Sequence, residues 1–105
     1  MASSGIRYNM TAIIYDKRGR ILSIGKNSYI KTHPLQKKYA TKVGMPDKVF
    51  LHAEIAAIIK CADLSRAYKI FISRFDYRGQ QKLAKPCPIC INAIKEAGIK
   101  EVYHT

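Results

Sequence analysis

Strand-like and helix-like segments alternate in the second half of the 105-residue chain, and this alternation constrains the fold most strongly. Apolar residues in segment 52–63 recur at helical spacing, whereas segment 68–75 (YKIFISRF) has the β-branched and aromatic composition of a buried strand. A second helix is predicted from Pro88 to Gly98, and a short strand covers 99–104. Because crossover helices join parallel strands, this order predicts an α/β fold whose sheet is largely parallel in the second half of the chain.

The first half of the chain begins with a predicted antiparallel hairpin. Segments 8–16 and 20–25 have strand composition, and the turn residues 16–19 (DKRG) separate them. A polar and basic region follows, in which proline and glycine favour a short helix over 34–42 that Gly44 closes. The hairpin therefore precedes the alternating elements, and we expect both to belong to the same sheet.

The charge and composition of the chain limit its class. Residues 1–105 are expected to form one domain, because this length supports a single core. The chain carries 19 Lys and Arg against 7 Asp and Glu, a formal net charge of +12. Such a surplus attracts polyanions and phosphorylated small molecules, but it also fits a solvated lysine-rich surface. Charge alone therefore leaves the substrate open.

The apolar segments are short, and cysteines are few. No apolar run reaches the roughly 18 residues of a membrane helix, so we expect no membrane association. Asp16 interrupts the first apolar stretch, which argues against a secretory signal. Three cysteines are an odd number and too few for a disulfide scaffold. These features together predict a cytoplasmic protein.

Two short motifs contain the residues that can carry chemistry, His52-Ala53-Glu54 and Pro86-Cys87-Pro88-Ile89-Cys90. Cys87 and Cys90 are three residues apart at a predicted helix start, so both sulfur atoms can reach one metal ion. The helix N-terminus also favours their thiolate forms. His52 begins the other helix and can point beyond its end toward the same ion. Three protein ligands with one open position are typical of catalytic zinc. We expect the site at the carboxyl edge of the parallel strands, where open α/β sheets bind their ligands.

Glu54 provides a reason to expect an enzyme. It follows His52 by two positions in an otherwise apolar helix start, where a lone buried carboxylate is costly without a role. Zinc lowers the pKa of a bound water toward about 7, and a nearby carboxylate can move the water's proton to a nitrogen atom. Such transfer contributes a factor of about 10²–10⁴ in rate. Attack of this water on an amidine-like carbon, with loss of the amine, is hydrolytic deamination.

The two motifs together resemble the H-x-E…P-C-x-x-C signature of the zinc-dependent cytidine/deoxycytidylate deaminase superfamily. The predicted order of elements is also similar to that family. The resemblance implies a cytidine-deaminase-like three-layer α/β fold, with a mixed sheet, an N-terminal antiparallel hairpin and β-α-β-α-β alternation. It implies that His52, Cys87 and Cys90 bind one catalytic Zn²⁺ and that Glu54 carries protons.

The resemblance also implies substrate contacts and partners. The backbone N–H of Ala53 would contact the base, Asn27 would contact the sugar or base, and Pro86 is a further substrate-binding candidate. The expected substrate is a small molecule, a cytidine or deoxycytidine nucleoside or nucleotide of the dCMP type, which yields the uracil form and ammonia. Because family members commonly complete their pocket with a neighbouring subunit, a homo-oligomer is expected.

Three alternatives remain open at the level of sequence. The net charge and the lysine-rich segment 26–48 fit a deaminase of a base in single-stranded DNA or RNA, including tRNA adenosine. The Pro-Cys-Pro-x-Cys motif also resembles guanine deaminases, which act on a purine base. A closed structural zinc site with Cys61, His33 or His104 as fourth ligand would instead indicate a zinc-stabilised binding module.

Overall fold

The computed structural model describes residues 9–45 and 50–105, so the predicted strand start at Tyr8 and the end of the lysine-rich segment lie outside the described residues. The described elements are β1 (Asn9–Tyr15), β2 (Ile21–Lys26), α1 (Pro34–Lys42), α2 (Ala53–Lys60), the 3₁₀ helix η2 (Leu64–Arg66), β3 (Lys69–Phe75), β4 (Gln81–Lys82), α3 (Pro88–Glu96) and β5 (Glu101–His104). The predicted hairpin, the three α-helices and the strands before and after α3 are therefore present.

The five strands form one mixed sheet. Its order is β2-β1-β3-β4, and β5 also pairs with β3. The predicted α/β fold with an antiparallel N-terminal hairpin is confirmed. The expectation that the sheet is largely parallel beyond the hairpin is wrong, because β1 and β4 both pair antiparallel with β3 and only β5 pairs parallel with it. Strand β1 lies between β2 and β3 and pairs antiparallel with both. Strands β2 and β3, which the crossover containing α2 connects, therefore run in the same direction but are not neighbours.

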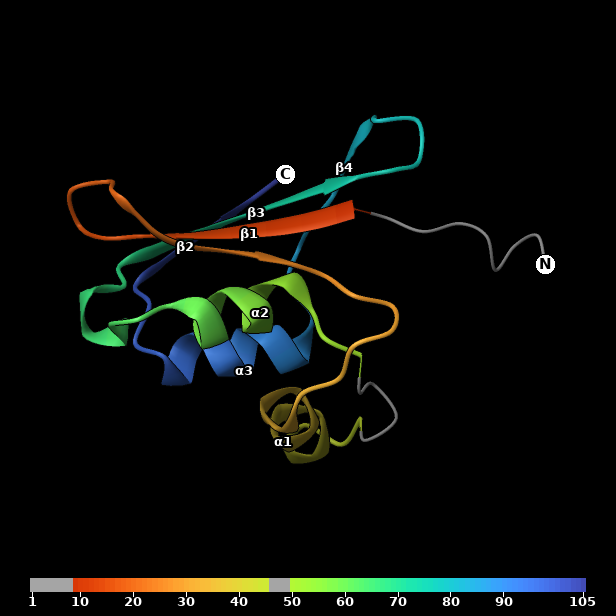
Figure 1. Ribbon diagram of the computed structural model, residues 1–105, viewed down its shortest axis with the longest axis horizontal. Helices are drawn as coiled ribbons and strands as arrows, with labels where there is room; N and C mark the ends of the chain where they lie inside the picture. Colours follow the sequence, from red (N-terminus) through yellow and green to blue (C-terminus); the bar gives the residue numbers. More distant parts are fainter. Residues whose placement is uncertain (1–8, 46–49) are drawn as a thin grey trace.

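The helices of the described residues lie on one side of the sheet. Figure 1 shows α2 and α3 side by side beneath the strands, with α1 beyond them. The core between these layers contains fully buried isoleucines from both, Ile14, Ile70 and Ile72 from the sheet, Ile55 from α2 and Ile89 from α3. Burial of this apolar surface fixes the starts of α2 and α3 relative to the sheet. None of the helices described here is long and apolar enough to cross a membrane.

Helix α2 ends earlier than the apolar spacing predicts. The sequence pattern extends the helix to Asp63, but the backbone of Cys61 is already extended (ψ 115°). The Asp63 carboxylate accepts a hydrogen bond from the Ser65 backbone nitrogen at 3.1 Å and so caps η2. The capping side chain thus decides the boundary. Likewise, the loop predicted after Gly79 contains the short strand β4, whose side chains are exposed and carry no apolar pattern.

Gly25 allows β2 to lie directly against α2. A Cβ atom at this position would overlap the backbone nitrogen of Ala57 and the carbonyl oxygen of Ala53. Because both are backbone atoms of α2, the overlap cannot be relieved by a rotamer change. We predict that Gly25→Ala lowers the free energy of unfolding by about 3 kcal/mol, measured by urea denaturation. Lys26→Ala, at the exposed neighbouring position, is expected to change it by less than about 0.5 kcal/mol. Equal effects would contradict this packing.

Candidate active site

Helices α2 and α3 begin next to each other at one end of the molecule (Figure 1). His52 is the N-cap residue of α2, Cys87 is the N-cap residue of α3, and Cys90 follows in the first turn of α3. The His52 Nδ1 atom lies 3.5 Å from the Cys87 Sγ atom and 3.2 Å from the Cys90 Sγ atom. All three ligand atoms lie within 4.8 Å of one another. The two motifs, 35 residues apart, therefore meet in one cluster.

Local sequence explains why these side chains are available. Both N-cap residues have extended backbone, and neither uses its side chain to cap its helix. Pro88, at the first position of α3, favours a helix start directly after Cys87. The imidazole of His52 and the thiol of Cys87 are thus left to project beyond the helix ends, where they face each other.

The donor set fits zinc. Bond lengths of about 2.0 Å to nitrogen and 2.3 Å to sulfur, in a tetrahedral arrangement, place nitrogen and sulfur about 3.5 Å apart. The two nitrogen–sulfur distances of 3.2 and 3.5 Å are close to that value. Among the described residues, no fourth His, Cys, Asp or Glu belongs to this cluster. The described residues therefore provide three ligands for one metal ion.

The three residues considered for a closed site lie elsewhere. His33 caps α1, where its Nδ1 atom accepts a hydrogen bond from the Leu35 backbone nitrogen at 3.0 Å. Cys61 is part of the hydrophobic core. The His104 Nδ1 atom lies 2.9 Å from the Thr105 carbonyl oxygen, at the exposed end of β5. None of them belongs to the metal-binding cluster, which argues against the closed structural site.

The two thiols differ in their ionisation. A hydrogen bond from Cys90, together with His52, lowers the pKa of Cys87 to about 4, so Cys87 is a thiolate at neutral pH. The hydrogen bond to Cys87 and burial raise the pKa of Cys90. Cys87 is therefore already in the form that binds a metal, whereas metal binding must release the proton of Cys90.

Glu54 lies in the first turn of α2 and is 2% exposed. Its Oε1 atom is buried and has no hydrogen-bond partner within the described part of the chain. Burial is the main cause of its raised pKa, because it penalises the charged carboxylate. An unsatisfied carboxylate of this kind is destabilising unless a ligand completes its hydrogen bonds.

A cavity of about 480 Å³ lies against the cluster, and Glu54 is the only acidic residue among the described residues that line it. Asn27, predicted to contact substrate, also lines it, and the Asn27 Oδ1 atom accepts a hydrogen bond from the Met10 backbone nitrogen at 3.0 Å. Ala53 is fully buried at the first position of α2. Pro86 is buried between two lining residues without lining the cavity itself. Contacts of these three residues with substrate stay predictions.

Gln36 of α1 is a positioning residue that sequence reasoning missed. It is fully buried, and its Oε1 atom accepts a hydrogen bond from the His52 backbone nitrogen at 3.1 Å. This bond connects α1 to the start of α2 and fixes the backbone of His52. No sequence signal marks Gln36, because it lies in a polar, basic segment among exposed residues.

The comparisons with known proteins address the family directly. The family described as the cytidine and deoxycytidylate deaminase zinc-binding region matches residues 2–105. The chain belongs to this family. No curated protein matches it. The predicted resemblance to the deaminase family is thereby confirmed. The prediction of a zinc cofactor is confirmed as well, because the family model describes a zinc-binding region and the His/Cys/Cys cluster can hold one metal ion.

Proposed function

We propose that this zinc-dependent deaminase removes the exocyclic amino group of cytosine in a cytidine or deoxycytidine nucleotide. The observation that carries the proposal is the Glu54 carboxylate, which is buried and lines the same cavity as His52 and Cys87. One of its oxygens has no hydrogen-bond partner among the residues that the structure describes. Proton exchange with a bound water and a substrate amine would explain why the chain keeps a destabilising buried carboxylate at this position.

In this proposal His52, Cys87 and Cys90 hold zinc, and Glu54 moves protons. Bound zinc supplies Lewis acidity, which lowers the pKa of water toward about 7. Glu54 accepts the two protons of the attacking water in turn and delivers one to ring nitrogen N3 and the other to the departing amino nitrogen. A carbon–oxygen bond forms, a carbon–nitrogen bond breaks, and ammonia leaves. Burial raises the pKa of Glu54 above its ordinary value, which favours its protonated form as the donor to the departing amine.

Binding and orientation of the base are assigned to residues around the cluster. We assign contact with the sugar or base to Asn27, contact with the base to the backbone N–H of Ala53, and a supporting role beside the substrate to Pro86. Asn27 is held by its bond to the Met10 backbone, so its side chain is preorganised at the cavity wall.

Two cations favour a nucleotide over a nucleoside. Arg74 and Lys85 both line the cavity, and among its described lining residues they face a single acid, Glu54. The Arg74 Nη1 atom donates a hydrogen bond to the Leu83 carbonyl oxygen at 3.3 Å, which holds the guanidinium near the end of β3. Lys85 is exposed directly before the zinc-site motif. A substrate phosphate at the cavity mouth would form charge-assisted hydrogen bonds with both.

We predict that Lys85→Gln raises KM for dCMP about tenfold, because one charge-assisted contact with the phosphate is lost. The KM for cytidine should stay within about twofold, because cytidine has no phosphate and so loses no contact with Lys85. Steady-state ammonia release measures both constants. Lys37→Gln, a change at an exposed position outside the cavity, serves as the control. An equal change for both substrates would contradict a phosphate contact at Lys85.

A substrate panel tests the proposed function as a whole. Ammonia release is measured for zinc-loaded protein with cytidine, dCMP, dCTP, guanine, a single-stranded DNA oligonucleotide and tRNA. The Glu54→Gln protein, prepared identically, reports contaminating activity. We expect the highest kcat/KM for a cytosine nucleotide. Turnover confined to guanine, or to the polynucleotides, would overturn the assignment in favour of a purine-base or nucleic-acid deaminase.

We also propose that residues 1–105 act as a single catalytic domain within a homo-oligomer. The sheet face away from the helices carries a row of paired apolar residues across four strands, Ile24, Ile13, Phe71 and Tyr103. Ile24 and Tyr103 are 43% and 51% exposed, so a second copy has apolar surface to cover. Light scattering should give at least twice the 11.9 kDa chain mass. A monomer at every concentration would refute this.

The cytoplasmic location stays a prediction.

A further inference from the structure

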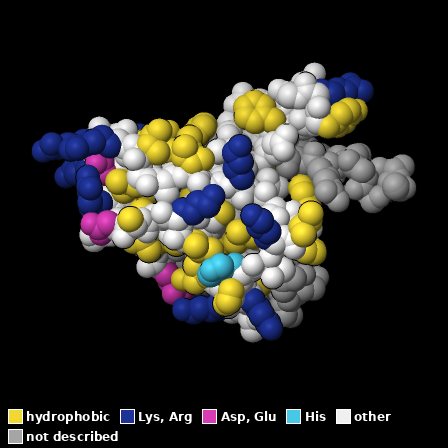
Figure 2. Space-filling model, viewed as in Figure 1, with side chains coloured by type: hydrophobic (Ala, Val, Ile, Leu, Met, Phe, Trp, Pro, Cys, Tyr) yellow, Lys and Arg dark blue, Asp and Glu magenta, His cyan; other side chains and the backbone are white. Residues whose placement is uncertain are grey.

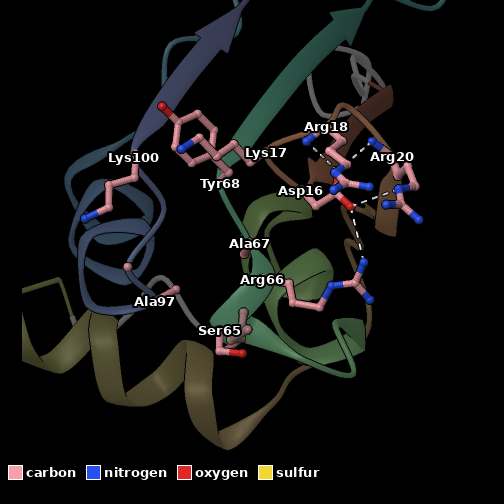
Figure 3. A pocket seen from close by; sticks show the side chains of 12 residues that line it. Asp16, Lys17, Arg18, Arg20, Ser65, Arg66, Ala67, Tyr68, Ala97 and Lys100 are labelled. Carbon is pink, nitrogen blue, oxygen red and sulfur yellow. Dashed lines mark hydrogen bonds and ion pairs between the residues drawn. The ribbon is translucent and has the colours of Figure 1, made fainter.

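A second cavity lies at the other end of the helices from the candidate active site. Its volume is about 780 Å³, and it is formed by the β1–β2 turn, η2 and the segment between α3 and β5 (Figure 3). Helices α2 and α3 both begin at the metal-binding cluster, and the chain that follows each of them lines this cavity. The two cavities share no lining residue. A ligand bound here would be distinct from the substrate.

The walls of this second cavity are strongly basic. Among the described residues that line it, one is acidic and five are Lys or Arg, namely Lys17, Arg18, Arg20, Arg66 and Lys100. Figure 2 shows Lys and Arg side chains gathered over the end of the molecule where the β1–β2 turn lies. These residues come from three segments that are distant in sequence, so the fold collects the charge at one place.

The single acidic residue organises part of this charge. Asp16 is buried, and its carboxylate accepts hydrogen bonds from the Arg18 and Arg20 backbone nitrogens, each at 2.9 Å. It also forms ion pairs with Arg20 Nε at 3.4 Å and Arg66 Nη2 at 3.3 Å. Asp16 therefore holds two guanidinium groups in place while their remaining N–H groups stay available for a ligand.

Three basic side chains in the cavity are left without acidic partners. Within residues 9–45 and 50–105, no ion pair involves Lys17, Arg18 or Lys100. The C-terminus of α3, near Ala97, contributes about half a negative charge and Asp16 one more, which does not neutralise five cations. The excess charge is therefore larger than helix capping or internal pairing requires.

We propose that this cavity binds a ligand with several linked phosphates, of the kind that nucleoside triphosphates and polynucleotides carry. Figure 3 shows Arg18, Arg20 and Arg66 around Asp16 on one side and Lys100 across from them. Because the cations line opposite sides of the cavity, a chain of linked phosphates offers more anionic groups to them than a single phosphate does. Arginine pairs with phosphate in a bidentate geometry, and the Tyr68 ring in the cavity wall offers a surface on which a base can stack.

The test compares a cavity variant with a matched control. The cavity variant combines Lys17→Gln, Arg18→Gln and Lys100→Gln, and the control combines Lys31→Gln, Lys37→Gln and Lys95→Gln. All six residues are exposed, and both variants lose three positive charges. Zinc-loaded proteins are titrated with inorganic tripolyphosphate and with a single-stranded oligo-dT, by calorimetry at low salt. We expect Kd to rise about tenfold in the cavity variant, and less than about threefold in the control.

The two ligands distinguish the source of the phosphates. If the oligo-dT binds through this cavity, the cavity variant also lowers the slope of log K against log salt by about 2, as expected for three lost contacts with a single strand. If only tripolyphosphate binds, the ligand is a free polyphosphate. Deamination of dCMP should be unchanged in both variants, because no substituted residue lines the active-site cavity. Absence of binding to either ligand, or equal weakening in both variants, overturns the proposal.

Discussion

Replacement of Glu54 by glutamine will lower kcat for dCMP by about a thousandfold while zinc remains bound at one ion per chain. The amide has nearly the same shape as the carboxylate but cannot accept a proton, and general acid–base transfer is worth about 10²–10⁴ in rate. Zinc should be retained because Glu54 is not part of the His/Cys/Cys cluster. Ammonia release and metal analysis on the same preparation measure the two quantities.

The matched control for this variant is Glu96→Gln, which changes a carboxylate on α3 that pairs with Lys42, and neither residue lines the cavity. Its kcat should stay within about twofold of the unmodified chain, since surface ion pairs contribute little. A Glu54→Gln protein that keeps more than a tenth of the activity would show that another group moves the proton, and the proposed role of Glu54 would be wrong.

Replacement of Cys90 by alanine will remove zinc, activity and much of the stability together. Cys90 is fully buried where α3 meets the core, and it belongs to the His/Cys/Cys cluster. Metal-binding energy is also folding energy in small zinc domains, so its loss should lower Tm by about 15 °C. Zinc content after dialysis against a weak chelator, and thermal unfolding monitored by circular dichroism, measure the effect.

Cys61→Ala separates metal binding from packing. Cys61 is also a buried cysteine of the core, but it lies outside the cluster. The variant should keep one zinc ion per chain and lose about 1–2 kcal/mol of stability from the small cavity that it creates. Zinc loss that is equal in both variants, or full zinc retention in Cys90→Ala, would exclude Cys90 as a ligand.

The sequence predicted the elements of the fold better than their pairing. Apolar spacing and proline positions are local signals, and they located the hairpin, the three α-helices and the strands on both sides of α3. Whether β1 pairs with β3 depends on which strands meet after folding, and no local pattern encodes it. The end of α2 was also misplaced, because the cap formed by Asp63 outweighs the apolar spacing that reaches Ala62.

The candidate site was predictable where its residues form short motifs. The spacing of Cys87 and Cys90 paired these two residues, and the expected position of both helix starts at one sheet edge predicted that His52 could join them. Gln36 was not predictable, because its importance arises from contact with a backbone nitrogen 16 residues away. The basic cavity was missed for the same physical reason, since its cations lie on three distant segments that only the folded chain brings together.

X-ray absorption at the zinc edge of the purified protein tests the central claim most directly, because it counts the atoms around the metal. Our account predicts two sulfur neighbours, one imidazole nitrogen and one light oxygen from solvent, which exchanges when a nucleotide analogue is added. A shell of four protein ligands, with a third sulfur or a second imidazole, would mean that no position is open for water, and it would contradict the assignment of a catalytic zinc site.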